Sequence, residues 1–155
     1  MGDEIDNVKE NIVRFAEAIE AMGVHARWSA ITYSDFTVSG ANEESIIIKN
    51  GAQNWFSSAV DYRDAINNIY LANGGDWEET AVDGMMLAYN DLEERKDARV
   101  FYILLTDAEC KDTNNYGVSS LGDCTDMLAD DSINVSVITS SECRSEYSYL
   151  YETTG

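Results

Sequence analysis

The segment RVFYILLTDAEC, residues 99–110, decides the fold of this chain. It passes from a continuous apolar run, residues 100–105, to a threonine and then an aspartate, Thr106 and Asp107. A short apolar run of this kind is typical of a strand that is buried on both faces of a parallel sheet. We therefore predict a strand over residues 98–106 that ends on a carboxylate at the edge of the sheet.

Predicted helices and strands alternate on both sides of this strand. Apolar residues recur every three or four positions from Ile5 to Met22, which predicts a helix over residues 2–22, with Gly23 after its C-cap. Further helices are expected over residues 58–68, 77–95, 120–131 and 145–154, and further strands at 25–34, 45–49 and 133–140. This order predicts an α/β fold, a doubly wound and mostly parallel sheet with helices on both faces.

The bulk composition indicates one acidic globular domain over residues 1–155. The net charge of −19 argues against binding to nucleic acid or to an anionic membrane, and it suits cations or basic partners. No apolar run has the roughly 20 residues of a membrane span, so direct membrane insertion is not expected. The cysteines Cys110, Cys124 and Cys143 are odd in number, which leaves a Cys110–Cys124 disulfide and three thiols both open.

The position of Asp107 raises a question of chemistry. In an open parallel sheet, ligands bind beyond the carboxyl ends of the strands, where Ser34 and Asp35 also follow an earlier strand. A carboxylate there needs a partner, because burying an unpaired charge is costly. The alternatives are a metal ion, a phosphoryl-transfer site with its own metal, or local hydrogen bonds.

The motif LLTDAEC, preceded one helix earlier by NGGDWEETAVDGMMLAY, resembles the von Willebrand factor type A (vWA) domain. In that family a strand ends in a pair like Thr106–Asp107, and a double glycine like Gly74–Gly75 opens the preceding helix. The opening MGDEIDNVKENIVRFAEAI also resembles the family's first helix, and ARWSAITYSD its second strand. The resemblance covers essentially all of the chain in the expected order.

The resemblance implies a protein–protein or adhesion-type binding module with a metal-ion-dependent adhesion site (MIDAS). Such a site holds Mg²⁺, or Mn²⁺ or Ca²⁺, and on this chain its ligands are expected to be Asp107, Thr80 and Asp76. A carboxylate of a protein ligand often completes the metal shell, and Trp77 and Glu109 are the expected partner contacts. We further expect an extracellular or cell-surface location, and the sequence leaves a cytoplasmic location open.

The chain also departs from the family pattern. The Asp-x-Ser-x-Ser loop that precedes the first helix, and the strand that carries it, are missing, and so is the last strand. We therefore expect a fragment of a longer chain, with weak or absent metal affinity in the chain as given.

Two other functions compete with this interpretation. One is a vWA-like scaffold that binds a partner without metal. The other is an aspartate-based phospho-receiver domain, which would place Asp107 similarly but requires a lysine after a late strand, and INVSVITSSEC has none. Cys110 has no histidine near it in sequence, which disfavours a cysteine nucleophile. We therefore expect a binding module rather than an enzyme.

Overall fold

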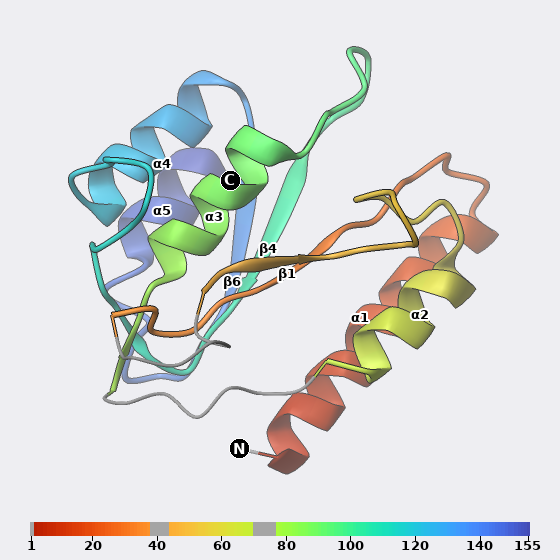
Figure 1. Ribbon diagram of the computed structural model, residues 1–155, viewed down its shortest axis with the longest axis horizontal. Coiled ribbons are helices and arrows are strands. Elements are labelled where there is room, and N and C mark those ends of the chain that lie inside the picture. Colours follow the sequence, from red (N-terminus) through yellow and green to blue (C-terminus); the bar gives the residue numbers. More distant parts are fainter. Residues whose placement is uncertain (1, 38–43, 70–76) are drawn as a thin grey trace. The chain divides into compact units, whose positions relative to one another are not determined.

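The computed structural model describes residues 2–37, 44–69 and 77–155, and these divide into two compact units (Figure 1). Unit 1 comprises residues 2–32 and 47–69. Unit 2 comprises residues 33–37, 44–46 and 77–155. None of the helices in the described part of the chain is both long and apolar enough to cross a bilayer.

Unit 1 is built on two helices, α1 (Gly2–Ala21) and α2 (Ala59–Asn67), which pack against each other (Figure 1). The short strand β1 (Ala30–Thr32) pairs with β2 (Ile46–Ile48), of which Ile47 and Ile48 belong to this unit, in a two-stranded sheet. Trp28 stacks on Tyr62 with ring centroids 5.7 Å apart. The buried core of the unit consists of Ala16, Phe56, Ala59, Tyr62 and Ile66.

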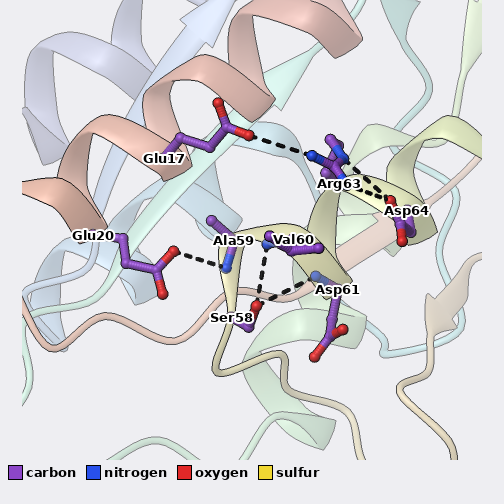
Figure 2. A network of polar contacts seen from close by, with 8 residues as sticks. All are labelled: Glu17, Glu20, Ser58, Ala59, Val60, Asp61, Arg63 and Asp64. Carbon is purple, nitrogen blue, oxygen red and sulfur yellow. Dashed lines mark hydrogen bonds and ion pairs between the residues drawn. The ribbon is translucent and has the colours of Figure 1, made fainter.

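Polar contacts fix the start of α2 against α1 (Figure 2). The Ser58 side chain caps α2 by accepting hydrogen bonds from the backbone N–H groups of Val60 and Asp61, at 3.2 and 3.5 Å. The backbone N–H of Ala59 donates to Glu20 of α1 at 3.3 Å. Helix α1 itself ends where Gly23 takes a positive φ of 74°, as its sequence position predicts.

Unit 2 holds a parallel pair of strands, β4 (Phe101–Leu105) and β6 (Asn134–Ile138), with three helices (Figure 1). The helices are α3 (Ala81–Asp91), α4 (Leu121–Asp130), which Ser120 caps, and α5 (Ser148–Thr154). A second, shorter parallel pair joins β3 (Glu78–Glu79) to β5 (Glu109–Cys110).

The pairing of β4 with β6 separates a covered face from an open one. In a strand, successive side chains point to opposite faces. Leu104 and Val135 belong to the buried core that the three helices complete, and Tyr102 and Val137 pack against it. On the other face Phe101, Ile103 and Ile138 are exposed. The helices α3, α4 and α5 therefore pack on one face of this sheet.

The predicted α/β class is confirmed, and most predicted elements lie within a few residues of their observed bounds. Within the described residues, however, the strands pair as three two-stranded sheets rather than as one continuous sheet. The helix expected from Trp77 begins only at Ala81, because the backbone of Glu78–Glu79 pairs with β5 instead. All three cysteines are free thiols.

Candidate functional site

The turn after β4 presents the Asp107 side chain to solvent. Its backbone is held from three sides, because the Thr106 N–H donates to the Ile138 carbonyl at 3.1 Å and the Cys143 thiol to the Asp107 carbonyl at 3.5 Å. The third contact is from the buried Tyr147 hydroxyl, which donates to the Ala108 carbonyl at 3.1 Å. Asp107 is exposed, so its carboxylate stays hydrated, needs no partner within the fold and is accessible to a ligand.

Thr80 lies at the N-cap of α3, but its hydroxyl bonds within the fold instead of facing a metal site as predicted. Its side chain is fully buried and makes no capping hydrogen bond. Instead, the hydroxyl donates to the Ser34 carbonyl, which also accepts the Thr80 N–H at 3.3 Å. No hydrogen bond links Thr80 to Asp107 in the part of the chain that is described, and Asp76 lies outside the described residues.

The predicted partner contacts lie on the β3–β5 pair. Its register places Glu78 beside Glu109, and Trp77, directly before Glu78, is 56% exposed. Glu109 is also exposed and follows Asp107 by two residues. The short parallel ladder therefore brings Glu78 and Glu109 side by side, with the exposed Trp77 directly before the ladder, although the two strands are far apart in the sequence.

Unit 2 also contains a buried ion pair, between Lys111 and Asp35, whose residues were not among the predicted ligands. The Lys111 ammonium donates to the Asp35 carboxylate at 2.5 Å, and Asp35 is fully buried. The other carboxylate oxygen accepts hydrogen bonds from the Thr37 N–H at 2.9 Å and from the Thr37 hydroxyl at 2.5 Å. Burial raises the pKa of the Asp35 carboxyl, but the hydrogen bonds from Lys111 and Thr37 outweigh burial and hold its pKa below the usual value.

Lys111 also ties this pair to the predicted site. Its backbone N–H donates to the Glu79 carbonyl at 2.8 Å, which extends the β3–β5 ladder by one bond. The sequence does carry a signal for Lys111, since it is the one basic residue between Arg99 and Arg144. A lone cation within an acidic stretch indicates a specific partner, but the sequence does not say which carboxylate it is.

Glu146 adds to the acidic surface beside β5. Its carboxylate accepts the Cys110 N–H at 2.9 Å. Burial raises the pKa of Glu146, and the nearby charges of Glu109 and Glu78 raise it further. This surface therefore holds its carboxylates under mutual repulsion, which a cationic ligand group would relieve.

These residues do not fit the complete metal site that the vWA resemblance implies. Over residues 2–37, 44–69 and 77–155, no group of three or more aspartate, glutamate, histidine or cysteine side chains could hold a metal ion. The Thr80 hydroxyl is engaged by a backbone carbonyl, and the buried Asp35 carboxylate already has an ammonium partner. Asp107 remains as an exposed, single ligand among the described residues.

Comparison with known proteins identifies the fold. No family model and no curated protein matches the chain. Among solved structures, proximal thread matrix protein 1 (PTMP1) from the mussel byssus matches with a TM-score of 0.65 and 14% identity, over 90% of this chain and 33% of that chain. A second PTMP1 structure, with a zinc-occupied MIDAS motif, matches with a TM-score of 0.52 and 20% identity, over 73% of this chain and 24% of that chain.

The chain thus spans a third or less of the PTMP1 chains that it matches. At these identities the likeness concerns the fold and not the ligands. It agrees with the independent order of elements around β4, where a strand ending in Thr106–Asp107 follows helix α3. The predicted resemblance is confirmed at the level of the fold: the chain has a fold of the von Willebrand factor type A kind.

Proposed function

We propose that this chain is a protein-recognition module of the adhesion type. The observation that carries the proposal is the exposure of Trp77, Glu109 and Asp107, which belong to one unit and lie on or next to the β3–β5 pair and the turn after β4. Aromatic side chains are enriched in protein interfaces, and exposed carboxylates steer basic partners toward them. The net charge of −19 favours the same class of partner.

In this chain the carboxylates themselves are proposed to contact lysine or arginine side chains of a protein partner. The metal-bridged alternative, in which a Mg²⁺, Mn²⁺ or Ca²⁺ ion joins Asp107 to an acidic side chain of the partner, needs ligands beyond those of the described residues. The zinc-occupied MIDAS motif of PTMP1 supports metal binding as a property of a similar fold. An extracellular or cell-surface location is proposed on the same likeness.

The chain is proposed not to be an enzyme. Burial raises the pKa of the Cys110 thiol to about 12, so the thiol is protonated near neutral pH and is a poor nucleophile. Asp107 has no basic side chain bonded to it in the described part of the chain, and Lys111 is paired with Asp35 instead. Neither arrangement supplies an acid–base pair for catalysis.

An arginine-rich peptide tests the recognition surface. We expect its affinity, measured by calorimetry, to weaken by about tenfold in the triple variant Trp77→Phe, Asp107→Asn, Glu109→Gln. The control Asp97→Asn, Asp130→Asn removes two exposed charges of the same unit that have no contact with the Asp107 turn among the described residues. Equal loss of affinity in both variants would show that the peptide responds to net charge alone and would overturn the proposal.

Metal dependence is tested by titrating the chain with Mg²⁺ and with Mn²⁺ in a calorimeter. We expect no saturable binding below about 1 mM, because Asp107 is the one exposed ligand of the predicted set that is described. Micromolar binding that Asp107→Ala abolishes and Asp97→Ala preserves would contradict this expectation. It would show that Asp107 works with further ligands and would favour the metal-bridged alternative.

A further inference from the structure

The segment that follows β2 makes a tight turn in unit 1, over residues 50–53 with the sequence NGAQ. The Asn50 N–H donates to the Gln53 carbonyl at 2.8 Å, and the Gln53 N–H donates to the Asn50 carbonyl at 3.0 Å. Gly51 has a positive φ of 61°, a conformation that costs glycine little and other residues more. A glycine at this position is typical of a two-residue turn between antiparallel segments. The turn therefore places a glycine directly after an exposed asparagine.

The Asn50–Gly51 pair combines two groups that can react with each other. The side-chain amide of an asparagine carries an electrophilic carbon, and the next backbone nitrogen can attack this carbon to close a five-membered imide ring. A Cβ on the following residue hinders the attack, and glycine has none. Apart from its chain neighbours, no described residue has an atom within 4 Å of the place that a Cβ on Gly51 would occupy. The approach to the Gly51 nitrogen is therefore open.

The local structure leaves both reacting groups available. Among the described residues, no hydrogen bond is found for the Asn50 side-chain amide or for the Gly51 N–H. The pairing of Asn50 with Gln53 is an isolated bridge outside the named strands. Residues 49–53 are all exposed, so opening the turn breaks two hydrogen bonds without uncovering a buried side chain, and local opening of this kind has a low free energy. The pair can therefore reach the geometry for ring closure while the rest of unit 1 stays folded.

The one comparable pair within residues 2–37, 44–69 and 77–155 is Asp83–Gly84, and the fold holds it differently. An aspartate before a glycine can close the same ring, but Asp83 is only 2% exposed and accepts the Asn115 N–H at 2.8 Å. The Gly84 N–H, which would have to attack, donates to the Thr80 carbonyl at 3.3 Å in the first turn of α3. The fold therefore blocks this pair and leaves the pair in the turn of unit 1 reactive. Asn73–Gly74 lies outside the described residues.

We propose that Asn50 is a site of spontaneous deamidation, with water as its co-reactant. The Gly51 nitrogen bonds to the side-chain amide carbon, the bond from that carbon to the side-chain nitrogen breaks, and this nitrogen takes up the Gly51 proton and leaves as ammonia. Water then opens the imide at either carbonyl and yields aspartate or isoaspartate, without any change of oxidation state. Either product adds one negative charge, and isoaspartate lengthens the backbone by one carbon, so the pairing with Gln53 is lost. The site lies in unit 1 and does not depend on the function proposed above.

The test follows the conversion of Asn50 in the folded chain over time. After incubation at mildly alkaline pH, cleavage after arginine releases residues 28–63, which contain Asn50 and Asn54 but not Asn73. Fragmentation in a mass spectrometer locates the mass gain and distinguishes aspartate from isoaspartate. We expect Asn50 to convert about tenfold faster than Asn54, a difference of about 1.4 kcal/mol in activation free energy, because the bulky Trp55 follows Asn54. Equal rates at the two asparagines would overturn the proposal.

A free peptide and one variant separate the effect of the fold from that of the sequence. If Asn50 converts in a synthetic peptide of residues 28–63 but stays intact in the folded chain, the fold protects the pair and the proposal is wrong. Asn50→Gln lengthens the side chain by one methylene, so attack by the Gly51 nitrogen would have to close a less favourable six-membered ring. Residue 50 is exposed, so the variant is expected to fold, and conversion at this position should be lost. Conversion at an unchanged rate would show that ring closure by Gly51 is not the route and would overturn the proposal.

Discussion

Replacement of Lys111 by methionine is expected to lower the free energy of unfolding by about 3–5 kcal/mol, because it leaves a buried carboxylate without its ammonium partner. Asp35 is fully buried, and the Lys111 side chain is only 15% exposed, so water cannot take the place of the lost cation. The Thr37 hydrogen bonds remain but do not neutralise the charge. Urea denaturation at neutral pH, followed by circular dichroism, measures the loss.

Two further variants separate the ion pair from a general loss of charge. Lys96→Met removes an exposed lysine and is expected to change the free energy of unfolding by less than about 0.5 kcal/mol. The double variant Asp35→Asn, Lys111→Met removes both charges and should recover much of the loss. A Lys111→Met variant as stable as Lys96→Met would show that the buried carboxylate does not depend on this ammonium.

The loss of stability in Lys111→Met should also depend on pH. In the wild type the pKa of Asp35 is lower in the folded state than in the unfolded state, so its contribution to stability is complete above about pH 4 and is lost as the pH falls through the folded pKa. Without Lys111 only the Thr37 hydrogen bonds oppose the effect of burial, so the folded pKa of Asp35 is higher than in the wild type, and acid protonates the carboxyl sooner and relieves the cost. The difference in stability between wild type and variant should therefore shrink as the pH falls from 7 toward about 3. A constant difference would contradict this account.

The sequence is informative where the signal is local. The apolar run before Thr106–Asp107 predicts a strand with a carboxylate at its end, and β4 (Phe101–Leu105) confirms it. Gly23 predicts the end of α1 because glycine tolerates the positive φ that follows a helix. The predicted helix starts near Ser58 and Ser120 are also confirmed. Each of these side chains accepts at least one hydrogen bond from a backbone N–H group in the first turn of its helix.

The parts that the sequence did not predict depend on tertiary contacts. Asp35 and Lys111 are 76 residues apart, and no spacing rule pairs them. Strands β3 and β5 have two residues each, too few for an alternating pattern to show. Thr80 has the hydroxyl expected of a ligand, but whether it faces a metal or the Ser34 carbonyl is decided by how residues 33–35 pack beside α3. Residue type alone could therefore nominate Thr80 without fixing its role.

Tyr147 is expected to show how firmly the core holds the Asp107 turn. Tyr147→Ala should lower the free energy of unfolding by about 3–5 kcal/mol, because the ring is fully buried and its loss leaves a cavity among α3, α4 and α5. Tyr147→Phe keeps the ring and removes only the hydrogen bond to the Ala108 carbonyl, so about 1 kcal/mol is expected. The exposed Tyr149 provides the matched control, and Tyr149→Ala should cost far less.

The phenylalanine variant also connects stability to recognition. The Tyr147 hydroxyl donates to the carbonyl of Ala108, the residue after Asp107. Removal of this hydroxyl should therefore change the amide chemical shifts of Asp107 and Ala108 while the rest of the fold stays intact. Affinity for the arginine-rich peptide should then fall although no residue of the proposed contact surface has changed. Unchanged shifts and unchanged affinity would mean that the Thr106–Ala108 hydrogen bonds suffice to hold the turn, and that Tyr147 contributes to packing alone.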